Sequence, residues 1–262
     1  LNAKVLNMSE KYKRDELGNR MKVYEHVANK DALIPNLPVI VRLDGNNFSK
    51  FTKNLEKPYD VNFTKLMQLT TEFLVSLFSK CYLGYTQSDE ITLVFYNNYQ
   101  DPLEFSGRIQ KLCSIIASKC TCFFALNASK YLPPNFEGMD TYPVFDCRIW
   151  NVPNWIEASN TILWREVDAT KNSIQTAAQT HLPKNRVHGI KNNEVQKILL
   201  EEADINWNDY PDSFKKGTYY IRYKNSETGR HTVMEQDEIP PLMSLDLKTR
   251  LEYLFPIIQE GL

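Results

Sequence analysis

The sequence lacks the features that mark membrane, secreted and polycationic proteins. None of its 262 residues belongs to an uninterrupted run of 18 or more apolar residues, so no membrane span is expected. The first residues do not combine a charged start, an apolar stretch and a small-residue cleavage site, so no secretory signal is expected. The formal net charge is −1, so a nucleic-acid partner would have to be held by local basic patches. We expect a cytoplasmic or mitochondrial protein that is neither secreted nor bound to a membrane.

Cysteine and glycine are also used sparingly. The five cysteines are odd in number and contain no Cys-x-x-Cys pair, which argues against a disulfide scaffold and a structural zinc site. With 9 glycines and 13 prolines, long disordered or fibrous stretches are not expected. An apolar content of 42% and a charged content of 24% are typical of a globular chain with a sizeable core.

The spacing of apolar residues predicts an α+β protein. The order of the first elements is strand, helix, hairpin, helix and strand, which is typical of a ferredoxin-like antiparallel sheet with helices on one face. A helical and hairpin extension over 153–262 is expected to pack on this first domain, 1–152, as one compact unit. The expected elements are a strand at 39–43, a helix at 61–80, a hairpin at 82–86 and 91–95, a helix at 103–126, a strand at 144–150, helices at 153–181 and 193–202, a hairpin at 218–223 and 232–235, and a helix at 245–255.

Two aspartates stand where the predicted strands end. Asp44 closes the first strand, and Asp89 lies in the turn of the hairpin. Neighbouring strands lie about 4.8 Å apart, so the two carboxylates can converge on one point. Such a pair suits hard cations such as Mg²⁺, and two of these ions can clamp the attacking and leaving oxygens of a phosphoryl transfer.

The residues after Asp44 suit phosphate binding. Gly45 allows an immediate turn and exposes a carbonyl as a further metal ligand. The polar turn 46–49 offers backbone N–H groups, and Lys57 offers a positive charge to a triphosphate. Taken singly, Asp-Gly and Ser-Asp-Glu are more typical of ordinary turns, and only their order along the chain favours a metal site.

In that order, the motifs closely resemble those of the tRNA-His guanylyltransferase family. The resemblance covers most of the chain and extends to the Trp-Arg helix. The residues that carry it are Asp15 to Glu25, Arg42-Leu43-Asp44-Gly45-x-x-Phe48, Tyr85-x-Gln87-Ser88-Asp89-Glu90-x-x-x-Val94-Phe95, Phe145-Asp146-Cys147-Arg148 and Trp164-Arg165-x-x-Asp168-Ala169-Thr170-Lys171-Asn172-Ser173-Ile174.

The resemblance implies a polymerase-like palm that adds nucleotides in the 3′-to-5′ direction. Two Mg²⁺ ions would be held by Asp44, the Gly45 carbonyl and Asp89, and Glu90 joins the two aspartates in the catalytic set. ATP and GTP or another nucleoside triphosphate would be the small substrates. The positions that match the family's nucleotide contacts are Asn46, Asn47, Phe48, Ser49, Lys57 and Ser88.

Two departures from the family pattern bear on the RNA. Where the tRNA-His-specific branch has His-Ile-Asn-Asn, this chain has Thr170-Lys171-Asn172-Ser173, which resembles the "like-protein" branch that repairs truncated tRNA 5′ ends on a template. Where the family commonly has Arg and His in the Asp-Gly loop, this chain has Asn46 and Ser49, so activation of a 5′-monophosphate is expected to differ.

Local basic residues are the candidates for RNA contact. Arg165 and Lys171 share one predicted helix and could follow a phosphate backbone, although an ion pair between Arg165 and Asp168, three residues along, explains Arg165 equally well. The resemblance also implies a homotetramer. The full set of expected RNA-binding residues is Arg20, Lys22, Arg165, Lys171, Asn172 and Arg186.

The expected activity is therefore templated 3′-to-5′ nucleotide addition to the 5′ end of tRNA, after ATP activates a 5′-monophosphate. Three alternatives stay open from the sequence. They are the addition of a single G to tRNA-His, a nucleotide cyclase on the same palm, and an RNA-binding protein without catalysis.

Overall fold

The structure is a computed structural model of the whole chain. It describes residues 18–19, 21–25, 31–133, 142–224, 228, 230–236 and 239–261. Within these residues six strands form one antiparallel sheet in the order β4-β1-β3-β2-β5-β6. The strands are β1 Leu37–Asn46, β2 Cys81–Gln87, β3 Glu90–Asn97, β4 Val144–Asn151, β5 Thr218–Lys224 and β6 His231–Gln236.

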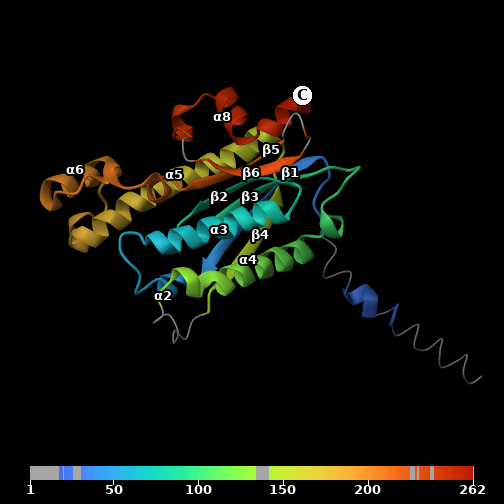
Figure 1. Ribbon diagram of the computed structural model, residues 1–262, viewed down its shortest axis with the longest axis horizontal. Helices are drawn as coiled ribbons and strands as arrows, with labels where there is room; N and C mark the ends of the chain where they lie inside the picture. Colours follow the sequence, from blue (N-terminus) through green and yellow to red (C-terminus); the bar gives the residue numbers. More distant parts are fainter. Residues whose placement is uncertain are drawn as a thin grey trace, which may run out of the picture.

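Helices cover both faces of this sheet. Figure 1 shows α3 and α4 side by side on one face and α5 along the other. The described helices are α2 Phe48–Phe51, α3 Val61–Leu77, α4 Ile109–Tyr131, α5 Trp155–His181, α6 Asn192–Ala203, α7 Asp212–Lys215 and α8 Leu247–Leu254, with short 3-10 turns at Glu104–Gly107, Lys184–Arg186, Trp207–Asp209, Leu242–Ser244 and Pro256–Gly261.

The expected α+β palm is confirmed. β1, α3, β2, β3, α4 and β4 follow the predicted order, and α3 and α4 lie on one face as expected. The C-terminal part, which is expected to pack on the palm, also extends the sheet of the palm, because β5 pairs with β2. α5, from the same part of the chain, covers the second face.

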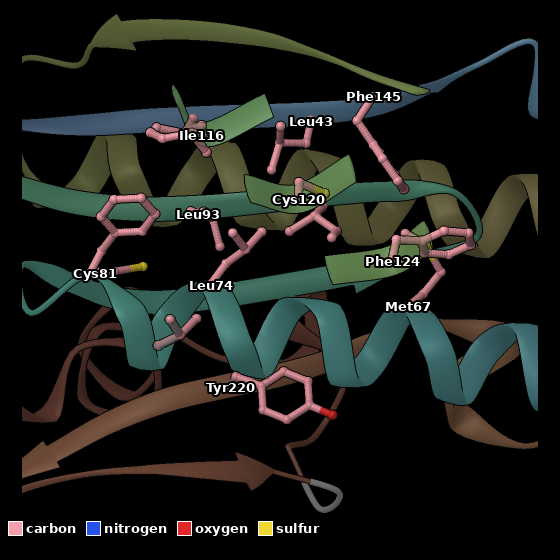
Figure 2. Close-up of a cluster of buried hydrophobic side chains, with 14 of the residues drawn as sticks. Leu43, Met67, Leu74, Cys81, Leu93, Ile116, Cys120, Phe124, Phe145 and Tyr220 are labelled. Carbon is pink, nitrogen blue, oxygen red and sulfur yellow. The ribbon is translucent and has the colours of Figure 1, made fainter. Parts of the chain in front are cut away.

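The main core lies between the sheet and the α3–α4 layer. The odd positions of β1, such as Val41 and Leu43, point into it, because side chains alternate along a strand. Figure 2 shows Leu74 of α3 and Ile116 and Phe124 of α4 meeting strand residues there. A second core, under α5, contains Ile40 from the opposite face of β1.

α4 begins six residues later than the spacing predicts. Phe105 and Ser106 have left-handed backbone angles, φ 57° and 54°, so a regular helix cannot run through them. Once begun, α4 is the one described helix that is long and apolar enough to span a membrane by length and composition. Its buried side chains, including Ile116 and Cys120, instead belong to the core beneath the sheet. All five cysteines are free thiols.

Candidate active site

The Asp-Gly segment and the β2–β3 turn meet at one end of the sheet. Asp44 lies opposite Glu90 in the β1–β3 register, and the Gly45 N–H donates to the Asp89 carbonyl oxygen at 3.1 Å. Ser88 has φ 49°, which lets the chain reverse in two residues between the strands. The structure therefore brings Asp44, Gly45, Ser88 and Asp89 together, as their order predicts.

The two aspartates create an uncompensated negative charge. Burial raises the pKa of Asp89, and the Asp44 carboxylate adds to that rise, while the backbone and Ser88 hydrogen bonds oppose it. Neither carboxylate forms an ion pair with any lysine, arginine or histidine that the structure describes. Two partly buried carboxylates that repel each other are the environment in which a divalent cation is stabilising.

The donor set fits Mg²⁺ better than softer metals. Its possible ligands are carboxylate and carbonyl oxygens, with no thiol or imidazole. No group of three or more His, Cys, Asp and Glu side chains within the described ranges could hold a metal. An ion on Asp44 and Asp89 would therefore complete its shell with backbone, water or phosphate oxygens, which is how Mg²⁺ is usually held beside a nucleotide.

Gly45 is required by close packing. A Cβ on this residue would come within 2.4 Å of the Phe48 ring, so no larger side chain fits. The ring itself is 2% exposed and lies 4.9 Å from both Phe51 and Phe145, centre to centre. The Phe48 ring is a core side chain that fixes the turn after Asp44. Phe48 also lines the cavity beside the aspartates, so its expected nucleotide contact stays a prediction.

A cavity of about 420 Å³ opens beside the aspartates. Its wall includes Ser49, Lys57, Ser88 and Asn172, which are all expected ligand-binding residues, whereas Asn46 and Asn47 are exposed outside it. Its size and its mixture of polar and aromatic groups suit a nucleotide. The wall is made of Asp44, Phe48, Ser49, Thr52, Leu55, Glu56, Lys57, Pro58, Tyr59, Asp60, Phe63, Thr64, Gln87, Ser88, Asp89, Glu90, Arg165, Ala169, Asn172, Ser173, Thr176, Ser213 and Phe214.

Glu90 and Arg165 form a buried ion pair. The Arg165 Nε and Nη2 donate to the two Glu90 carboxylate oxygens at 2.6 and 2.7 Å, and both side chains are under 10% exposed. Burial raises the pKa of Glu90, and the Arg165 hydrogen bonds oppose that rise. Arg165 also pairs with Asp168 at 3.1 Å. The alternative of an ion pair is therefore observed, and Arg165 is placed to join α5 to the catalytic turn instead of reaching toward solvent.

The other expected RNA contacts are scattered. Lys171 and Asn172 are exposed on α5, and Lys22 is exposed near the N-terminus. Arg186 is exposed and bonded to Glu202, at 2.8 Å from its Nε. Arg20 lies outside the described residues.

Two features near the site had no signal in the sequence. Tyr59, after Lys57-Pro58, stacks on Phe214 of α7 with ring centres 5.1 Å apart, although 155 positions separate them. Arg42 of β1 lies over the Trp164 ring of α5 at 5.9 Å. Both contacts join the palm to the C-terminal part, and only the folded chain brings their partners together.

The motifs at this site match two family descriptions. Residues 18–153 match the family described as tRNAHis guanylyltransferase, and residues 144–248 match the description Thg1 C terminal domain. The chain belongs to the tRNAHis guanylyltransferase family. It is therefore a nucleotidyltransferase, as the sequence predicts.

Individual relatives support this family membership. An uncharacterized protein of Acanthamoeba polyphaga mimivirus is 33% identical over 75% of this chain and 74% of its own length. The tRNA(His) guanylyltransferase of Saccharomyces cerevisiae is 29% identical over 73% of this chain and 85% of its own length.

Solved structures of the family share the whole architecture. A bacterial tRNA(His) guanylyltransferase-like protein in complex with ATP superposes with a TM-score of 0.79 at 31% identity, over 91% of this chain and 99% of that chain. The same description in complex with GTP gives a TM-score of 0.72 at 30% identity, over 87% and 94%.

Proposed function

We propose that this member of the tRNAHis guanylyltransferase family adds nucleotides to the 5′ end of tRNA in the 3′-to-5′ direction, on a template. The observation that carries the proposal is that Asp44 and Asp89 both lie in the wall of a nucleotide-sized cavity. The ATP and GTP complexes of the similar bacterial proteins support nucleoside triphosphates as the occupants of that cavity.

Two Mg²⁺ ions would be held by Asp44, Asp89 and the Gly45 carbonyl, and when bound they would lower the pKa of an attacking hydroxyl and neutralise phosphate charge. The protein's own contribution is positioning. Lys57 lies in the cavity wall and supplies a positive charge for a triphosphate. The Glu90–Arg165 pair fixes the turn that carries Asp89 against α5.

The proposed sequence of reactions has two steps. ATP first transfers AMP to the 5′-monophosphate of the RNA, releasing pyrophosphate. The 3′-hydroxyl of an incoming nucleotide then attacks the activated 5′ phosphorus and expels AMP. An RNA that carries a 5′-triphosphate would skip the first step. Thr170, in place of the histidine of the tRNA-His-specific branch, supports repair of truncated tRNA over addition of a single G.

The test is sequencing of the 5′ ends produced when the purified protein acts on a tRNA transcript lacking its first nucleotide. Templated repair restores the nucleotide that pairs with the opposite strand, whereas an enzyme of the tRNA-His-specific branch adds a single G to tRNA-His. Asp44→Ala and Asp89→Ala serve as inactive controls, and wild-type activity in either would refute the metal assignment. Incubation with ATP or GTP alone, without RNA, detects a cyclase.

The oligomeric state and the compartment belong to the same proposal. We expect a homotetramer, which light scattering coupled to size-exclusion chromatography would measure; a clean monomer would contradict it. We expect the protein in the cytoplasm or mitochondrion, where localisation of the tagged full-length chain would place it.

A further inference from the structure

A partly exposed surface lies beside Asp44, on the face of the sheet toward α5. β1 carries Arg42 and Asp44 on the face toward α5, and in the β1–β4 register Arg42 lies opposite Arg148. Cross-strand neighbours on one face are about 5 Å apart, and positions i and i+2 of a strand about 7 Å. Arg42 and Arg148 are therefore close neighbours, one strand repeat from Asp44.

Trp164 completes this surface. It is 52% exposed in the middle of α5, which is unusual for so large an apolar side chain. The Arg42 and Arg165 guanidinium carbons lie 5.9 and 4.6 Å from its ring centre, so cation–π contacts hold the ring in place. We name Arg42, Arg148 and Trp164 the arginine–tryptophan shelf.

The shelf borders the cavity, because Arg165, the neighbour of Trp164 on α5, lies in the cavity wall. Asn172, a cavity residue further along α5, is eight positions from Trp164, about 12 Å along the helix axis, and Arg165 bonds to Glu90. Phosphoryl transfer needs two substrates that meet at the carboxylates. The cavity suits the nucleotide, so the adjoining shelf is the surface left for the second substrate.

The shelf offers two guanidinium groups to a phosphate, beside the facing carboxylates of Asp44 and Asp146. The Arg42 Nε is buried and has no hydrogen-bond partner in the part of the chain that the structure describes. Among the described residues, Arg148 pairs only with Asp146, at 3.4 Å, and both side chains are about half exposed. An exposed ion pair of this kind is weak, so a phosphate can replace Asp146 as the partner of the Arg148 guanidinium at a small cost in free energy.

Resting on the proposed function, we infer that the shelf receives the 5′ end of the RNA. Arg42 and Arg148 face the terminal phosphate, and the Trp164 ring stacks on the terminal base or base pair. An RNA end fits better than a free nucleotide, because β4 is an edge strand and the shelf is open to a macromolecule. Trp164 is thus a substrate-positioning residue for the acceptor end.

The experiment measures binding and turnover separately on a 5′-phosphorylated tRNA transcript lacking its first nucleotide. Fluorescence anisotropy of 3′-labelled RNA gives Kd without catalysis, and 5′ extension gives KM for RNA and for the triphosphate. Trp164→Ala should weaken RNA binding about 5- to 150-fold, the range for loss of one base stack, while KM for the triphosphate stays unchanged. Trp164→Phe, which keeps an aromatic face, should retain most of the affinity.

The Arg148→Ala variant tests whether the shelf binds the 5′ phosphate of the RNA. Wild type should bind 5′-phosphate RNA more tightly than the same RNA with a 5′-hydroxyl, and the variant should lose that difference and lower the salt slope by about one. Matched controls are Tyr99→Ala, an exposed aromatic (74%), and Lys248→Ala, an exposed cation paired with Glu252. Both should bind RNA like wild type, and thermal melting confirms that every variant is folded.

Four results decide between the two proposals. Wild-type RNA affinity in Trp164→Ala, or an equal rise in KM for the triphosphate, would overturn the shelf, and so would a wild type that does not bind the RNA. If instead wild type binds RNA, the shelf variants weaken that binding and no extension occurs, the shelf stands and the proposed activity fails.

Discussion

At the residue scale, the site depends on positions where one added side-chain atom would disrupt the packing. Gly45 is the clearest, because its backbone passes directly over the Phe48 ring. We predict that Gly45→Ala destabilises the fold by about 1–3 kcal/mol, since the ring is locked between other aromatic side chains and cannot move away.

Urea unfolding measures this loss, and Gly18→Ala is the matched control, because a Cβ on Gly18 meets nothing within 4 Å. Equal stability of the two variants would show that the turn after Asp44 can open without cost.

Glu90 and Arg165 raise the question of whether Glu90 is a catalytic ligand or a positioning residue. Removing one member of a buried ion pair leaves an uncompensated charge, so Glu90→Ala should cost about 3–5 kcal/mol of unfolding free energy. Arg165→Ala should cost a similar amount, and the double variant clearly less than the sum.

A double-mutant cycle in urea provides the measurement. A catalytic ligand without a structural role would give the opposite pattern: activity lost in Glu90→Ala, with stability unchanged and no coupling to Arg165.

At the element scale, most helices and strands could be predicted, because their apolar residues repeat at 3.6 or 2 positions and the core they form is local. The start of α4 could not be predicted, since the left-handed turn at Phe105 and Ser106 has no marked local sequence signal. α4 also illustrates what composition cannot decide, because an apolar helix of 23 residues suits a bilayer or a protein core equally well.

We predict that the two faces of α4 differ sharply. Ile116→Ala, on the buried face, should destabilise the protein by about 2–5 kcal/mol, because it leaves a cavity against the sheet. Leu126→Ala, at 71% exposure, should change the unfolding free energy by less than about 0.5 kcal/mol. Urea unfolding compares them, and a large loss in Leu126→Ala would reveal that this face is covered by a partner.

At the scale of the whole molecule, hydrogen bonds to Glu166 connect α5, on the second face of the sheet, with β5 and with the C-terminal segment. The buried carboxylate of this α5 residue accepts hydrogen bonds from the Tyr219 hydroxyl and, at 2.7 Å, from the Leu242 N–H. Burial raises the pKa of Glu166 despite these bonds, so the folded state holds the proton more tightly than the unfolded state.

The sign of the pH effect follows. Above the raised pKa the buried charge lowers stability, and below the unfolded pKa that penalty is absent. Glu166→Gln should therefore be more stable than wild type near neutral pH, with the difference shrinking to zero as the pH falls. Thermal melting across pH 4–8 measures it; a constant difference, or a less stable variant at neutral pH, would contradict the assignment.

The sequence by itself determined the family, the order of the palm elements and the pair Asp44 and Asp89, because these depend on local patterns that can be read along the chain. Tertiary structure alone decided the rest. It placed Phe48 in the core, paired Arg165 with Glu90 and joined β5 to β2. It also set Trp164 beside Arg42. Each of these contacts joins residues whose side-chain direction or burial is set only when the sheet and the helices pack together. No local periodicity in the sequence identifies the partner of any one of them.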